Sequence, residues 1–168
     1  MFTGMVTDSG RFRYDSTSPR TFELAAFLMK AGIDTNTLYR NLYAEDLERA
    51  RFRASFLQKI RTYKDSPVAY IYNTAEDIRE MNVTDPFSVS RGMVNVMADL
   101  RGIDIWVNFT EADGEVLCEL RSSALNVQPI AVKYGGGGHE KACGATVPDR
   151  KTAMKMLEDL LKLAEQNT

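Results

Sequence analysis

The chain has 168 residues, of which 44% are apolar and 26% charged, and its formal net charge is −2. This composition is typical of a folded globular protein that is long enough for one domain with a flanking piece. Binding along a long nucleic-acid backbone is disfavoured because the chain has no basic excess, whereas short anionic ligands held by a few local charges remain compatible. No signal peptide and no apolar stretch of membrane-spanning length are visible, so we expect a cytoplasmic protein without a membrane segment.

The first third of the chain predicts a short strand and two helices. Residues 2–6 are expected to form a strand that leads into a turn at residues 7–10. Residues 21–31 have apolar side chains at helical spacing and are followed by a glycine stop. Asp34 or Thr35 can cap a second helix that is expected to run to about residue 61. A helix of that length spans on the order of 40 Å, which suits a connector between two lobes.

The remainder of the chain predicts an α/β domain at residues 64–168. The expected elements are a strand at 68–72, a helix at 74–81, a helix opening at residue 85, a strand at 103–109, a strand at 115–120, a helix at 127–134, a strand at 143–147 and a final helix after residue 149. Asp113 and Gly114 are a strong hairpin signal between the strands predicted at 103–109 and 115–120. This order of elements favours a mixed β-sheet flanked by helices.

The most informative motif is a run of four glycines that ends in the only histidine of the chain, His139. Ordered glycines let the backbone take a positive φ or let a ligand approach bare N–H groups, which suit phosphate and other anions. The histidine adds a donor that can contact a phosphate oxygen. The alternative interpretation is a flexible linker, although the small residues that follow indicate that the fold continues.

Arg121 is the second candidate, because it stands at the end of a predicted strand where a rigid scaffold can direct its guanidinium group. Arginine can bind a phosphate group through two hydrogen bonds. Ser122 and Ser123 can add hydroxyl donors. A solvated arginine at a strand end is the alternative interpretation.

Two motifs carry a family resemblance that covers nearly the whole chain. The order of a strand ending in Leu-Arg-Ser, a short helix, the glycine–histidine segment and a small-residue segment resembles the DHHA1 substrate-binding module of the DHH phosphoesterase superfamily. Residues 3–12 resemble the last motif of the catalytic DHH domain, and their wording is most similar to the branch of bifunctional oligoribonucleases and 3′-phosphoadenosine-5′-phosphate phosphatases. The resemblance predicts a remnant of the DHH domain at 1–33, a connector helix at 34–63 and a DHHA1 domain at 64–168.

The resemblance also implies roles for individual residues. Asp8 corresponds to a metal ligand, in a family whose catalytic domain holds two metal ions, usually manganese. The chain lacks the Asp-His-His motif that supplies other ligands, so we expect it to be inactive without an N-terminal DHH domain. The substrate-binding candidates are Arg121, Ser122, Gly135, Gly136, Gly137, Gly138 and His139.

The resemblance implies that the ligands are short oligonucleotides and 3′-phosphoadenosine-5′-phosphate, an adenosine bisphosphate. Two alternatives stay open: part of a cyclic-dinucleotide phosphodiesterase of the same superfamily, and a free-standing nucleotide-binding module without catalysis. Apolar positions within residues 1–30 fit contact with a missing domain, a homodimer, or local disorder.

Overall fold

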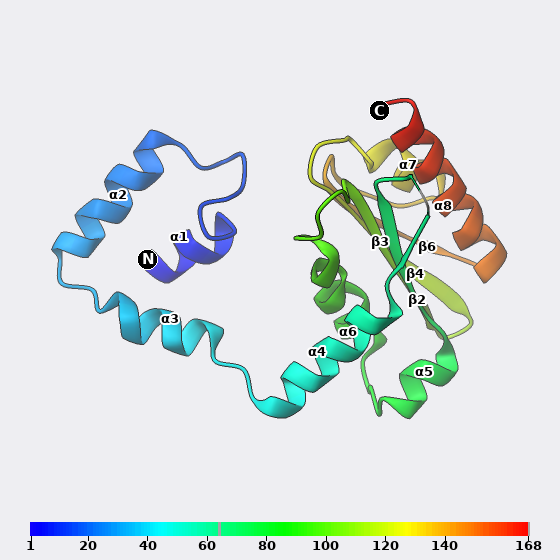
Figure 1. The fold of residues 1–168 in the computed structure, drawn as a ribbon, viewed down its shortest axis with the longest axis horizontal. Coiled ribbons are helices and arrows are strands. Elements are labelled where there is room, and N and C mark those ends of the chain that lie inside the picture. The colour runs from blue at the N-terminus through cyan, green and yellow to red at the C-terminus, as the bar shows by residue number, and fades with distance from the viewer. Residues whose placement is uncertain (64, 168) are drawn as a thin grey trace. The chain divides into compact units, whose positions relative to one another are not determined.

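The computed structural model describes residues 1–63 and 65–167, and it divides into two compact units. The first unit is Met1–Arg49, and the second begins at Ala50. Figure 1 shows the helices of the first unit in the colours from blue to cyan and the sheet-containing second unit in the colours from cyan to red. None of the helices formed by the described residues is long and apolar enough to cross a membrane.

The first unit consists of α1 (Phe2–Asp8), α2 (Pro19–Lys30) and α3 (Thr35–Tyr43). The strand predicted for residues 2–6 is wrong, because this segment is the helix α1. Phe2 and Val6, four residues apart, lie on one helical face and are buried in a small core with Ala25. The helix predicted at 21–31 is confirmed as α2, and Ser18 and Thr21 form a capping box at its start.

The continuous connector helix predicted from residue 34 to about residue 61 is also wrong. The structure has α3 and then a separate helix, α4 (Leu47–Lys59). Ala44 takes an extended conformation with ψ of 127°, which ends α3. The side chain of Asp46 then accepts a hydrogen bond from the backbone N–H of Arg49 at 2.7 Å, as an N-cap residue does. The border between the two units falls after Arg49, within α4.

The second unit contains one six-stranded mixed sheet, which confirms the predicted α/β class. Its strands lie in the order β1-β2-β3-β4-β6-β5, and among the described residues only β2 and β3 are parallel neighbours. The elements are β1 (Arg61–Thr62), β2 (Val68–Asn73), α5 (Ala75–Glu80), α6 (Pro86–Met93), the 3₁₀ turn η1 (Val94–Met97), β3 (Ile105–Ala112), β4 (Glu115–Ser122), α7 (Gln128–Lys133), β5 (Gly137–His139), β6 (Ala142–Val147) and α8 (Arg150–Glu165).

Local signals in the sequence account for several of these elements. The hairpin between β3 and β4 turns at Asp113 and Gly114, both with positive φ, as a two-residue turn requires. Thr74 and Asp77 form the capping box of α5. The helix that opens at Asp85 ends earlier than its apolar spacing indicates, because α6 passes into η1 at Val94.

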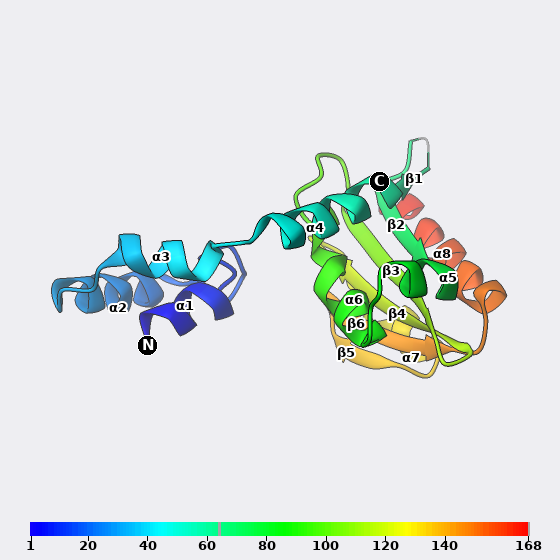
Figure 2. The same cartoon turned by 90° about the horizontal axis from the view of Figure 1, so that it is seen from below.

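Helices cover both faces of the sheet, and each face has its own core. Figure 2 shows α8 on one side of the sheet and α4 and α6 on the other. Successive side chains of β3 point to opposite faces of the sheet, so this strand contributes to both cores. Val107 and Phe109 belong to the core under α7 and α8, whereas Trp106 belongs to the core under α4, α6 and η1.

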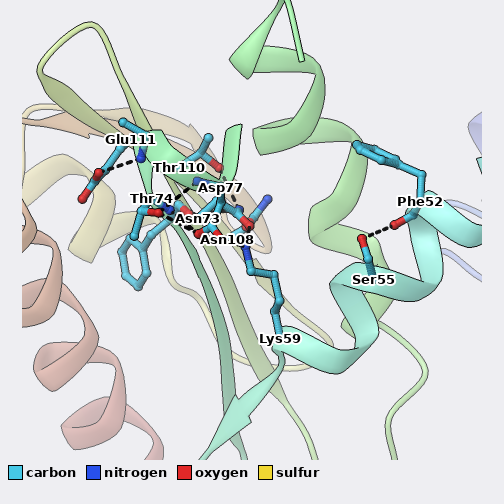
Figure 3. Close-up of polar contacts among 11 residues, drawn as sticks. Phe52, Ser55, Lys59, Asn73, Thr74, Asp77, Asn108, Thr110 and Glu111 are labelled. Atoms are coloured by element: carbon cyan, nitrogen blue, oxygen red, sulfur yellow. Dashed lines mark hydrogen bonds and ion pairs between the residues drawn. The ribbon is translucent and has the colours of Figure 1, made fainter. Parts of the chain in front are cut away.

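A polar network with a buried centre holds α4 and α6 against the second of these faces, and Figure 3 shows its members Lys59, Asn73, Asp77 and Asn108. Nδ2 of Asn73 donates to Oδ1 of Asn108 at 2.9 Å, and Nδ2 of Asn108 donates to the carbonyl oxygens of Val89 and Ser90 in α6. Lys59 at the end of α4 forms an ion pair with Asp77 at 2.9 Å. Because Asn73 and Asn108 are fully buried, these bonds fix the position of α6 relative to β3.

Candidate functional site

The pairing of β4, β6 and β5 brings Arg121 and His139 to one face of the sheet. Arg121 pairs with Ala142 in the β4–β6 ladder, and His139 pairs with the same Ala142 in the β5–β6 ladder. Directly paired residues of antiparallel strands project to the same side. The two backbones are separated by two strand spacings, about 10 Å, which is within the span of a nucleotide phosphate and its sugar.

The next set of paired residues on this face, one from each of the same three strands, contains two glycines. Glu119 pairs with Gly144, and Gly144 pairs with Gly137. A Cβ at Gly144 would lie 2.8 Å from the carbonyl oxygen of Cys118 and 3.4 Å from Oε1 of Glu119. Bare backbone therefore extends from Glu119 to the exposed edge strand β5, beside Arg121 and His139.

The four glycines of the run have different structural roles. Gly135 ends α7 with φ of 79°. A Cβ at Gly136 would meet the carbonyl oxygen of Gly144 at 2.0 Å, and Gly138 combines φ of 132° with a contact of 2.7 Å to Cys143. Gly137 has nothing within 4 Å of the position of a Cβ. The fold therefore requires three of the glycines, Gly135 for its positive φ and Gly136 and Gly138 for their close packing, whereas Gly137 has neither restriction.

The sequence predicts a glycine loop between the helix at 127–134 and the strand at 143–147, and the structure confirms only part of it. Gly137 to His139 form the edge strand β5 and pair with β6, so the turn is confined to the residues before Gly137. Because Gly136 and Gly138 have no Cβ, their backbone can pack closely on β6, and this allows the segment to join the sheet. The linker interpretation is excluded by this pairing.

The guanidinium group of Arg121 is largely enclosed, with 20% of its side chain exposed. Its Nη1 donates to Oε2 of Glu119 at 3.1 Å and to the carbonyl oxygens of Leu120 and Cys143 at 2.8 and 3.4 Å. Within residues 1–63 and 65–167, Nε and Nη2 have no hydrogen-bond partner. Arg121 is thus anchored through one nitrogen, and the donors on its other nitrogens stay available for an anion.

Ser122 does not join this site. It pairs with Ile105, and its alternation with Arg121 along β4 directs its side chain to the opposite face of the sheet. Its Oγ accepts hydrogen bonds from the N–H groups of Ala124 and Leu125 at 3.2 and 2.8 Å. Ser122 stabilises the turn after β4, and this explains its burial.

Two residues of the site, Glu119 and Arg91, were not among the sequence candidates. Oε1 of Glu119 accepts a hydrogen bond from Nε of Arg91 at 3.1 Å, so α6 is tied to β4 next to Arg121. Arg91 and Glu119 are 28 residues apart in the chain. The sequence holds no local signal that could have predicted this contact.

An ion pair and a hydrogen bond between α7 and α8 position the residues that precede the glycine segment. Lys133 and Tyr134, at the end of α7, both donate to Oδ2 of Asp159 in α8, at 2.6 and 2.8 Å. Burial acts to raise the pKa of Asp159, but the bonds from Lys133 and Tyr134 outweigh it, and the pKa is lowered. Burial and the bond to Asp159 raise the pKa of Tyr134 to about 12. The backbone entering Gly135 is therefore fixed to α8.

Asp8, the predicted metal ligand, lies in the first unit, whereas the other candidates lie in the second. It is the exposed last residue of α1, and its Oδ1 accepts a hydrogen bond from Thr7 at 3.2 Å. Among the residues that the structure describes, no three His, Cys, Asp or Glu side chains are grouped so that they could hold a metal ion. These residues do not fit a two-metal centre.

Comparison with known proteins identifies the family of this fold and site. The family model of the DHHA1 domain matches residues 83–167, about half of the chain. The chain belongs to the DHHA1 family. The match begins before α6 and contains Arg91, Glu119, Arg121 and the glycine segment. It confirms the resemblance to the DHH phosphoesterase superfamily.

Relatives of this DHHA1 chain extend the similarity to its first unit. The chain is 34% identical to the bifunctional oligoribonuclease and PAP phosphatase NrnA of Mycoplasma genitalium, over 96% of the chain and 50% of the relative. It is 26% identical to the protein of the same name from Bacillus subtilis, over 99% of the chain and 52% of the relative. The chain therefore spans about half the length of these curated relatives.

A solved structure shows the same architecture. The crystal structure of an exopolyphosphatase-related protein from Bacteroides fragilis matches 96% of the DHHA1 chain with a TM-score of 0.82 and 27% identity. The match covers 48% of that protein.

Proposed function

We propose that this chain is the substrate-binding part of a metal-dependent DHH phosphoesterase that hydrolyses short oligonucleotides and 3′-phosphoadenosine-5′-phosphate. The observation that carries the proposal is the row of Arg121, Ala142 and His139 across three strands, beside the bare backbone at Gly137 and Gly144. Two cationic or polar donors on one face, next to backbone without side chains, suit a phosphate with an attached sugar or base. The names of the relatives support this choice of ligands.

In this proposal the chain contributes binding and orientation. Arg121 holds a phosphate through Nε and Nη2, and His139 contacts the same nucleotide from the edge strand. A phosphoester that is held in one orientation loses much of the entropic barrier to its hydrolysis. The metal ions, which we propose to be manganese, would be held by a further domain, because the described residues lack a sufficient donor group. The chain alone is then inactive.

The test is calorimetric titration of the chain with 3′-phosphoadenosine-5′-phosphate and with a diribonucleotide. The same titrations are done with Arg121→Ala, with His139→Ala and with Arg79→Ala, which removes an exposed arginine from α5 as a matched control. We expect saturable binding that the first two substitutions weaken and the third leaves unchanged. Circular dichroism establishes that each variant is folded. The absence of binding to the folded chain would contradict the proposal.

A further inference from the structure

The carboxylate of Glu119 is shared by two arginines from different elements. Its Oε1 accepts from Nε of Arg91 on α6 and its Oε2 accepts from Nη1 of Arg121 on β4, both at 3.1 Å. Only 13% of the Glu119 side chain is exposed. An enclosed carboxylate with both oxygens engaged fixes the direction of each guanidinium group.

Both arginines keep donors that this carboxylate does not use. Arg91 is bonded through Nε alone, so its two terminal nitrogens have no partner among the described residues. Arg121 is bonded through Nη1 alone. Each guanidinium group thus presents a free set of N–H donors, which match the oxygen atoms of a phosphate. Gly144 keeps the space beside Glu119 free of a side chain.

We propose that Arg91 is a second phosphate-binding residue and makes this site selective for ligands with two phosphate groups. This inference depends on the proposed function, since it assigns Arg121 to the first phosphate. Glu119 is the positioning residue that holds the two guanidinium groups apart, so that each receives one phosphate. A nucleotide with a single phosphate engages Arg121 and gains nothing from Arg91.

Arg91 is suited to a clean test, because its side chain is 72% exposed and its ion pair contributes little to stability. Alanine is a favourable residue in a helix, so Arg91→Ala is expected to fold. The affinities to compare are those for 3′-phosphoadenosine-5′-phosphate, which has two phosphates, and for 3′- and 5′-adenosine monophosphate, which have one each.

We expect Arg91→Ala to weaken binding of the bisphosphate about tenfold, as loss of one charge-assisted hydrogen bond does at a partly exposed site. Its affinity for both monophosphates is expected to stay within about twofold of the wild-type chain, because neither reaches Arg91 in addition to Arg121. Arg91→Lys keeps the charge but not the fork of donors, and an intermediate loss is expected. Arg79→Ala, the control for net charge, is expected to change none of these affinities.

The outcomes distinguish a failure of this inference from a failure of the proposed function on which it depends. If the folded wild-type chain binds none of the three nucleotides, the proposed function is wrong and the role of Arg91 with it. If it binds them and Arg91→Ala lowers the bisphosphate and monophosphate affinities by equal factors, or changes neither, only the role of Arg91 is overturned.

Discussion

Arg121 and His139 lie on the same face of the sheet because both residues pair with Ala142, from opposite sides of β6. They are brought together by two antiparallel ladders, one on each side of that strand. The side chain between them is a methyl group. In the proposed function a phosphate contacts both residues on this face, and substitutions at the neighbouring glycines should separate the requirements of the fold from those of the ligand.

The first prediction compares two adjacent glycines. Gly136→Ala places a methyl group against the carbonyl oxygen of Gly144, and we expect the free energy of unfolding to fall by about 2 kcal/mol or more. Gly137→Ala meets open space, so its free energy of unfolding should stay within about 0.5 kcal/mol of the wild-type value. Urea unfolding measures both. Equal losses in the two variants would mean that the packing of β5 on β6 is not as described.

The second prediction concerns the pH dependence of stability from Asp159. Because the pKa of this carboxyl is lowered below its ordinary value of 3.8 in the folded chain, its contribution is fully present above that value. It is lost as the pH falls through the lowered pKa of the folded state. At neutral pH, Asp159→Asn is expected to lower the free energy of unfolding by about 1 kcal/mol.

The measurement is urea unfolding of the wild-type chain and Asp159→Asn between pH 7 and pH 3. The difference between them should be constant down to about pH 5 and should shrink below about pH 4. A difference that is the same at pH 3 and at pH 7 would show that the ionised form of Asp159 contributes nothing.

The third prediction concerns the buried amide that holds α6. Asn108→Leu preserves the approximate size of the side chain but removes both hydrogen bonds to the carbonyl oxygens of Val89 and Ser90. We expect a loss of about 2–3 kcal/mol in the free energy of unfolding, because Asn73 also loses a buried acceptor. Asn95→Ala, at an exposed position in η1, is the control and should have little effect. An unchanged free energy of unfolding in Asn108→Leu would contradict the role of Asn108 in holding α6.

The fourth prediction concerns the two free thiols. Burial raises the pKa of Cys118 to about 12 and that of Cys143 to about 11. Because the thiolate is the reactive form, neither side chain should react appreciably with an aromatic disulfide reagent at pH 8 while the chain is folded. Both should react in denaturant. Rapid reaction of either thiol in the native chain would indicate local opening of β4 or β6.

Much of the second unit could be predicted from residues that are close together in the chain. The turn at Asp113 and Gly114, the capping box of Thr74 and Asp77, and the cap at Asp149 all depend on contacts within a few residues. The same reasoning failed where two local signals competed. Residues 2–6 have the composition of a strand, but the spacing of Phe2 and Val6 suits a helix that buries both.

Only part of the candidate site could be predicted from the sequence. The sequence identified Arg121 and the glycine–histidine segment as candidates, because arginine, histidine and glycine are recognised from residue type alone. It could not determine which glycines the fold itself requires, nor that Ser122 faces away from Arg121. Those distinctions depend on strand register, which a single sequence does not define when partners are distant.

The sequence by itself determined the helices that have strong caps, the hairpin between β3 and β4, and the small-residue segment around His139. Only the tertiary structure decided that this segment is an edge strand, that Gly137 is its one unconstrained glycine, and that Glu119 joins Arg91 to Arg121. The physical reason is the range of the interactions. Caps and turns form between neighbours in the chain, whereas the site is assembled by ladders and ion pairs between residues that are far apart in it.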